Sequence, residues 1–319
     1  MRYFLSLVVL VLVLAATATT AATTARAVRA VPAAATLRVV ATTEDLASLA
    51  REVGGDKVTV DAIAKGYQDP HFVEAKPSFI LKFSRADLLL IVGRELEIGW
   101  LPSLINNSRN SKIQVGASGY LDASADVKIL DIPTGQITRA MGDVHPSGNP
   151  HYWLDPGNGR IMARSIRDRL TQLDRANAAY YAQRYDDFDT RLAAAELRWD
   201  AMMAPHHGSK MVTYHRSWPN FVDRFRLDVI GYVEPKPGVP PSPSHTLTLI
   251  EEMKSQDVMI IAIEPYFDSK TPKQIGGQTG AEVLVLAPSV GGVPGTDDYI
   301  KLFDYNVKLL ADALARAGK

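Results

Sequence analysis

Apolar and polar positions alternate with two different periods along the first half of the chain. Runs of aliphatic and β-branched side chains predict strands at residues 37–42, 57–64, 87–93 and 111–118. Apolar side chains at helical spacing predict helices at residues 42–55 and 77–86. Thr43 can cap the first of these helices, and Gly54 ends it. This alternation of strands and helices predicts an α/β lobe with a parallel sheet.

The same alternation returns in the second half of the chain. Strands are predicted at residues 210–215, 227–233, 258–265 and 281–288. Helices are predicted at residues 216–226, 242–256, 271–280 and 296–317. The second half therefore echoes the first and predicts a second α/β lobe.

The longest helical stretch, roughly residues 157–204, lies between these two patterns. Asp174 can cap its second part, in which apolar residues recur at helical spacing with no glycine or proline before Pro205. We predict an α/β fold in which one long helix joins two βα lobes with parallel central sheets. The predicted parts are an N-terminal lobe (residues 36–173), a linking helix (residues 174–204) and a C-terminal lobe (residues 205–319).

Residues 1–27 have the three-part form of a cleavable secretory signal peptide. Arg2 precedes an apolar run, and small residues follow with Ala25-Arg26-Ala27 as the cleavage site. A retained N-terminal anchor is the alternative. The chain contains no cysteine, so it has no disulfides and no cysteine to carry a lipid. We therefore expect the mature protein to be free in the periplasm if the source is a bacterium.

The charge balance of the chain excludes one class of partner. Lys+Arg and Asp+Glu are equal at 35 each, which gives no basic field to attract nucleic acid.

Several side chains with metal-binding chemistry follow predicted strands. His71 comes after the second predicted strand, His215 ends the strand at residues 210–215, and Glu264 closes the one at residues 258–265. Ligands of open α/β sheets bind outside the carboxyl ends of the strands. Residues from both halves are therefore placed to converge in a cleft between the lobes. Imidazole and carboxylate together suit zinc and other divalent first-row ions.

The local sequence around two histidines also suits a metal ligand. Pro70 and Pro150 stiffen the backbone directly before His71 and His151. A ligating histidine usually donates its other ring N–H to a carboxylate or a carbonyl. The carboxylates we expect in this role are Asp69, Asp155 and Glu234. Each histidine alone also fits a turn or core position, so the prediction rests on the set and its order.

Three motifs and the segments around them carry a specific resemblance. These are D-P-H in "DPHFVEAKPS", P-H-x-W-L-D-P in "NPHYWLDPGNGRIMARSI", and the strand-end Y-H in "MVTYHRSWPNFVDRFRLDVIG". In this order they resemble the metal-binding extracytoplasmic solute-binding proteins of ABC transporters, the family that delivers zinc or manganese to a membrane permease. The resemblance extends over nearly the whole mature chain.

The resemblance implies two lobes joined by one rigid backbone helix, with the ion between them. It implies that His71 and His151 come from the first lobe and His215 from the second. It further implies a monomeric periplasmic binding protein without enzymatic activity, which delivers a divalent ion to an ABC permease in the inner membrane.

One position departs from the family pattern. Many members place an aspartate ligand in the turn after the last strand, where this chain has Ala287 and Pro288. We predict Glu264 as the fourth ligand, with water and His145 as alternatives. Three nitrogen ligands with at most one carboxylate favour Zn²⁺ over Mn²⁺.

Two other functions fit the same residues. A secreted zinc hydrolase would keep an open water position, with Glu264 as general base. The chain has neither an H-E-x-x-H motif nor a G-x-S-x-G nucleophile elbow, which argues against this reading. A binding protein for a metal chelate on the same scaffold is the other alternative.

Overall fold

The computed structural model describes residues 36–138, 141–142 and 144–318. The predicted signal peptide, residues 1–27, lies outside the described residues. Within this described part, none of the helices combines the length and the apolar character needed to span a membrane.

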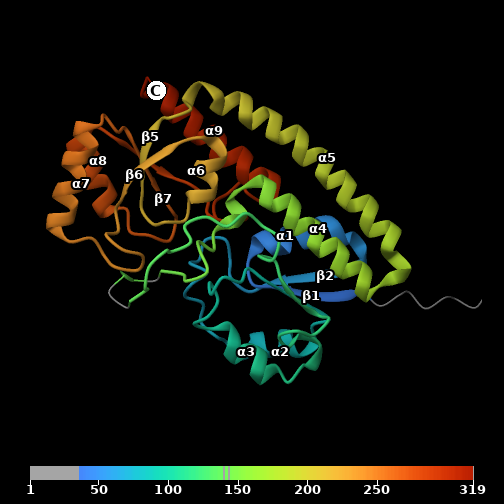
Figure 1. The fold of residues 1–319 in the computed structure, drawn as a ribbon. Helices are drawn as coiled ribbons and strands as arrows, with labels where there is room; N and C mark the ends of the chain where they lie inside the picture. The colour runs from blue at the N-terminus through green and yellow to red at the C-terminus, as the bar shows by residue number, and fades with distance from the viewer. Residues whose placement is uncertain (1–35, 139–140, 143, 319) are drawn as a thin grey trace, which may run out of the picture. The chain divides into compact units, whose positions relative to one another are not determined.

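The first lobe is built on a parallel four-stranded sheet with the strand order β2-β1-β3-β4. Its strands are β1 (Leu37–Ala41), β2 (Val58–Ala62), β3 (Leu88–Ile91) and β4 (Tyr120–Asp122). Its connecting helices are α1 (Glu44–Gly54), α2 (Pro77–Arg85) and α3 (Leu101–Ser108). Every residue of β3 is buried, as expected for an apolar strand inside a parallel sheet. Figure 1 shows α1 on one side of this sheet and α2 and α3 on the other.

The second lobe repeats this topology with the strand order β6-β5-β7-β8, again all parallel. Its strands are β5 (Lys210–Thr213), β6 (Asp228–Tyr232), β7 (Ile260–Ile263) and β8 (Glu282–Val285). Its helices are α6 (Pro219–Phe225), α7 (Pro243–Ser255), α8 (Lys270–Thr279) and α9 (Tyr299–Arg316). The predicted fold class, two α/β lobes with parallel sheets and a long helix between them, is confirmed.

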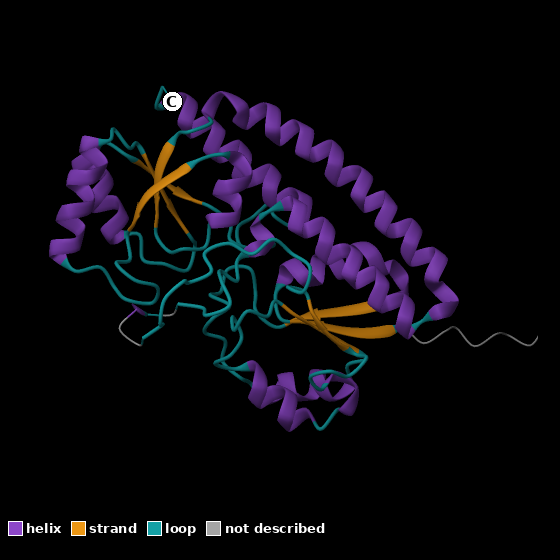
Figure 2. Ribbon diagram, in the orientation of Figure 1, coloured by secondary structure: helices purple, strands orange, loops and turns teal. Residues whose placement is uncertain are grey.

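The long helical stretch consists of two helices, α4 (Pro156–Leu173) and α5 (Ala178–Met203). Asp174 lies at the break, where its carboxylate accepts hydrogen bonds from Asn177 (2.6 Å) and the Tyr181 hydroxyl (2.8 Å). The apolar stripe predicted for the second helix is buried: Tyr181, Tyr185, Phe188, Leu192, Ala195 and Trp199. Helix α5 packs on α1 and α4 from the first lobe and on α9 from the second, as Figure 2 shows.

One continuous hydrophobic core extends through both lobes. Trp199 of α5 contacts Phe303 of α9, with their ring centroids 5.2 Å apart. Asp45, at the start of α1, accepts hydrogen bonds from the Ser289 hydroxyl and from the Val290 backbone N–H (2.9 Å) after β8. Because large apolar side chains and a buried carboxyl join the lobes, we infer that they do not move freely as separate bodies.

The strand predicted at residues 111–118 is wrong. Asn110 accepts a hydrogen bond from the Lys112 N–H (3.0 Å) and starts a short 3₁₀ turn instead. Val115 is 77% exposed, so this apolar residue belongs to a surface loop. The fourth strand is β4, where buried Leu121 pairs with β3. Helix α3, which has a proline in its first turn, was not predicted.

The Asp45 contact predicts a pH dependence of stability. Burial raises the pKa of Asp45 from 3.8 to about 7. Between these values the carboxyl is protonated in the folded chain and ionised in the unfolded chain. The protonated Asp45 carboxyl therefore adds most to the free energy of unfolding at low pH. This contribution is lost as the pH rises through the folded-state pKa of about 7, by up to about 1.4 kcal/mol per pH unit.

Asp45→Asn should remove this component, because asparagine retains a hydrogen-bonding side chain but does not ionise. Urea unfolding of chelator-treated protein at about pH 5 and about pH 7.5 should show a smaller loss of stability for the variant than for the wild type. Asp126→Asn, at an exposed position, is the control and should behave like the wild type. An unchanged pH dependence in Asp45→Asn would contradict this role of Asp45.

Candidate metal centre

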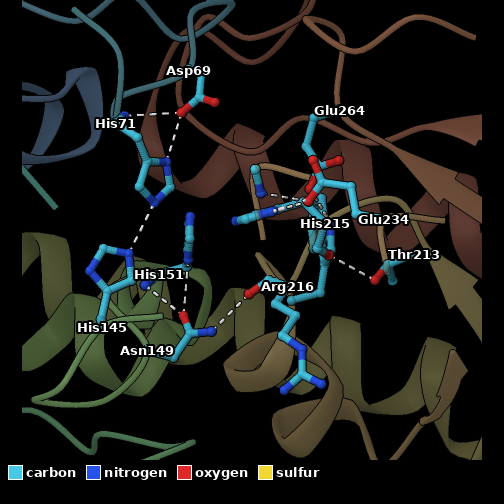
Figure 3. A network of polar contacts seen from close by, with 12 residues as sticks. Asp69, His71, His145, Asn149, His151, Thr213, His215, Arg216, Glu234 and Glu264 are labelled. Carbon is cyan, nitrogen blue, oxygen red and sulfur yellow. Dashed lines mark hydrogen bonds and ion pairs between the residues drawn. The ribbon is translucent and has the colours of Figure 1, made fainter. Parts of the chain in front are cut away.

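The three histidines of the predicted site lie on loops at the carboxyl ends of the two sheets. His71 is on the loop after β2, His151 is just before α4, and His215 is just after β5. Figure 3 shows His71 and His151 on one side of the site and His215 on the other. The topology of parallel sheets thus brings together residues that are far apart in sequence.

These three histidines form a compact cluster. One ring nitrogen from each lies within 4.8 Å of the other two. The ring centroids are 5.2 Å apart for His71 and His151, 5.5 Å for His151 and His215, and 5.6 Å for His71 and His215. Among the described residues, this is the only group of three or more histidine or acidic side chains with metal-binding spacing. Neither Glu264 nor His145 belongs to it.

Two of the histidines are held by the same local arrangement. The Asp69 carboxylate accepts hydrogen bonds from both the backbone N–H (3.0 Å) and Nδ1 (2.7 Å) of His71. The Asn149 carbonyl oxygen does the same for the backbone N–H (2.9 Å) and Nδ1 (2.9 Å) of His151. A proline separates the two members of each pair. One oxygen therefore fixes both the backbone and the ring of each histidine.

His215 obtains the same restraint from a different element. Its Nδ1 lies 2.8 Å from Oε2 of Glu234, which follows β6. The carbonyl oxygen of His215 accepts a hydrogen bond from the Thr213 hydroxyl (2.8 Å). Both the ring and the backbone of this histidine are thus oriented.

This pattern fixes which nitrogen of each ring is available. The oxygens of Asp69, Asn149 and Glu234 can only accept, so we assign the ring proton of each histidine to Nδ1. Each Nε2 then carries a lone pair. The Nε2 of His151 is buried without a hydrogen-bond partner. A buried polar atom without a partner is costly, and a bound cation would satisfy it.

Asn149 also joins the two lobes at the site. While its oxygen holds His151, its amide nitrogen donates a hydrogen bond to the carbonyl oxygen of Arg216 (2.7 Å), next to His215 (Figure 3). The side chain needs both an acceptor and a donor for these contacts. One amide therefore couples the histidine loops of the two lobes.

Glu264 lies at the border of the cluster. It directly follows β7 and is fully buried. Its Oε1 accepts a hydrogen bond from the Trp218 indole (2.9 Å), whereas Oε2 is buried without a partner. Burial raises the pKa of Glu264 to about 7, although the charge of His215 acts in the opposite direction.

His145 lies next to His71, with their Nε2 atoms 3.2 Å apart. Burial and the charge of His71 lower the pKa of His145 to about 4. His145 is therefore neutral near pH 7.

The pKa values of His151 and His215 shift in opposite directions because their surroundings differ. Burial lowers the pKa of His151 well below its usual value. Burial acts in the same direction on His215, but the hydrogen bond to Glu234 and the charge of Glu264 outweigh it and raise its pKa. Burial opposes the ionisation of Asp69, yet the hydrogen bond from His71 outweighs it and lowers the pKa of Asp69.

Of the three carboxylates predicted to accept hydrogen bonds from the histidine rings, two do so and one does not. Asp69 and Glu234 take this role, as predicted. The prediction for Asp155 is wrong, because its carboxylate caps α4 by accepting from the Gly157 N–H (2.8 Å). Asn149 takes its place. The repeated Asx-Pro-His order at residues 69–71 and 149–151 was the signal that could have identified it.

Comparison with protein families gives one match over most of the chain. The family described as zinc-uptake complex component A periplasmic (ZnuA) matches residues 39–313.

Two curated relatives are named for different cargo, one for metal in general and one for manganese. The metal ABC transporter substrate-binding lipoprotein ScbA of Streptococcus cristatus is 26% identical over 292 residues, covering 89% of this chain and 90% of the relative. The manganese ABC transporter substrate-binding lipoprotein PsaA of Streptococcus anginosus is 25% identical over 289 residues, covering 88% and 90%.

Solved structures share the fold. A crystal structure of ZnuA has a TM-score of 0.74 at 24% identity, covering 87% of this chain and 99% of that one. The manganese-bound periplasmic metal binding protein from Candidatus Liberibacter asiaticus has a TM-score of 0.72 at 20% identity, with coverages of 87% and 99%.

The oxygen contacts predict the tautomers of the three histidines. In chelator-treated protein, above the titration range of histidine, His71, His151 and His215 should each carry the ring proton on Nδ1, because Nδ1 faces an accepting oxygen. Two-dimensional ¹H–¹⁵N NMR of the ring nitrogens distinguishes the tautomers. Protons on Nε2 of these residues would contradict the assigned arrangement.

Proposed function

Since this chain belongs to the family of periplasmic metal-binding components of ABC transporters, we propose that it binds a zinc ion through His71, His151 and His215 and delivers it to a permease. Members of this family are substrate-binding transport proteins, not enzymes. This sets aside the secreted hydrolase considered from the sequence.

The ligand assignment rests on one observation: the Nδ1 atom of each of the three imidazoles is hydrogen-bonded to an oxygen. Each Nδ1 is held by an oxygen, which leaves each Nε2 lone pair available to an ion. Neutral imidazoles supported in this way are typical ligands of protein-bound zinc. The Nε2 of His151, buried without a partner, gives a further reason for an ion at this place.

The choice of zinc rests on the type of donor atom. The cluster offers three nitrogens and no carboxylate within the described residues. Manganese prefers sites with more oxygen donors, whereas zinc accepts three imidazoles. Some relatives are named for manganese, so competition between the two ions is the decisive comparison.

The delivery pathway follows from the family and the sequence. We propose that the protein acts as a monomer in the periplasm after removal of residues 1–27, and that it docks on an ABC permease in the inner membrane. We keep the division into residues 36–173, 174–204 and 205–319 as two lobes and their linking helix.

The hydrophobic core shared by the two lobes limits how the ion can be released. Because one hydrophobic core runs through both lobes, we infer that release uses a local change in the histidine loops rather than wide opening of the lobes. The bridge from Asn149 to Arg216 is the contact that such a change would break.

A metal-loading experiment tests this proposal. Chelator-stripped mature protein should rebind about one zinc per chain in chelator-free buffer. His151→Ala should lose most of this binding, because it removes a ligand nitrogen. Zinc should also displace manganese in competition. His207→Ala, at an exposed position, is the matched control and should load like the wild type.

Equal zinc content in His151→Ala and the wild type, with thermal melting showing both folded, would remove His151 from the ligand set. Failure of the wild type to bind the bare ion would favour the metal-chelate alternative. Preference for manganese would leave the family function intact and refute the choice of zinc.

A further inference from the structure

We propose that His145 is the fourth nitrogen ligand of the bound ion, supplied by the loop between β4 and α4. The proposal rests on the three-histidine site proposed above and identifies the ligand that completes it.

The distance between His71 and His145 fits two ligands of one ion. Imidazole nitrogens bind zinc at about 2.0–2.1 Å, so two nitrogens in a tetrahedral shell lie about 3.3–3.4 Å apart. The Nε2 atoms of His71 and His145 are 3.2 Å apart, and Figure 3 shows the two rings facing each other. The two nitrogens share a hydrogen bond here, and their separation is close to that of two ligands in a tetrahedral zinc shell.

Two cavities are lined by His145 together with histidines of the cluster. A cavity of about 590 Å³ is lined by both His71 and His145. A smaller cavity of about 60 Å³ is lined by His145, His151 and His215. Among the described residues, His145 is the only histidine that lines both. His145 therefore shares a cavity with each of the three clustered histidines.

Arg94 holds the loop that carries His145. Its side chain donates a hydrogen bond to the carbonyl oxygen of Ser147 (3.3 Å), two residues after His145. The same guanidinium donates to the hydroxyl (3.1 Å) and carbonyl oxygen (3.3 Å) of Ser124. One residue after β3 thus supports the loop on both sides of His145.

The backbone on both sides of Arg94 has unfavourable dihedral angles. Gly93, Arg94 and Glu95 have positive φ values of 77°, 52° and 66°. Residues other than glycine rarely adopt this region, and they persist there only when surrounding contacts hold them. Glu97 supplies such contacts by accepting hydrogen bonds from the N–H groups of Val92 (2.7 Å) and Gly93 (3.0 Å). The cost of this turn is consistent with a role in presenting His145.

Glu264 is the other candidate for this position. Its Oε1 is engaged by the Trp218 indole, whereas its Oε2 is buried without a partner. Glu264 and His145 both lie outside the three-histidine cluster, but the Nε2 of His145 lies 3.2 Å from the Nε2 of His71. We assign the fourth position to His145 because of this short distance and because it lines a cavity with each of the three clustered histidines.

The test uses zinc titration of the full mature chain, followed by ring-nitrogen NMR and by affinity measurements in competition with a chelator. One equivalent of zinc should shift the Nε2 signals of His71, His145, His151 and His215 together. His145→Ala should still bind one ion but with affinity lowered by about tenfold or more, as expected when a metal site loses a coordinating or supporting residue. Glu264→Gln should bind more tightly than His145→Ala, and His207→Ala should match the wild type.

The outcomes separate the two proposals. Zinc-induced shifts of the other three histidines without a shift of His145, together with unchanged affinity in His145→Ala, would overturn the fourth-ligand assignment and leave the proposed function intact. A large loss of affinity in Glu264→Gln but not in His145→Ala would also overturn it and assign Glu264 instead. No shift of any histidine on adding zinc would refute the proposed function itself.

Discussion

The site depends on one constraint: each of its three imidazoles must direct one ring nitrogen to the centre while the other ring nitrogen is hydrogen-bonded. Asp69, Asn149 and Glu234 meet this requirement by accepting hydrogen bonds at Nδ1. These partners determine the tautomer and ring orientation before any ion arrives, so little rearrangement opposes binding. Without the three oxygens, the histidines would still be neighbours, but their lone pairs would have no common direction.

The fold supplies the positions of these oxygens and rings through repetition. Two sheets with the same strand order place loops from their carboxyl ends around one centre. A continuous core, built on α1, α4, α5 and α9, keeps the two sets of loops in a defined relation. The amide of Asn149 then joins them directly at the site. Such a frame suits a protein that holds one small ion and releases it through local changes.

Much of this arrangement could be predicted from the sequence, but not the contacts between distant segments. A strand-end position indicated His71 and His215, and a preceding proline indicated His71 and His151, because these are local signals. Asp155 follows His151 closely in sequence, but its carboxylate caps α4. Asn149 instead accepts the hydrogen bond from Nδ1 of His151. The apolar residues at 111–118 looked like a strand, but strand formation depends on burial against a neighbour, and Val115 is exposed. The separation of Glu264 from the cluster likewise depends on tertiary packing.

The central claim is that an ion binds to imidazole nitrogens of converging loops from both lobes. Zinc-edge X-ray absorption of the loaded protein tests it most directly, because it reports the type, number and distance of the ligands. The account predicts a shell dominated by imidazole nitrogens at about 2.0–2.1 Å. A shell made mainly of oxygen atoms, without imidazole scattering, would contradict it.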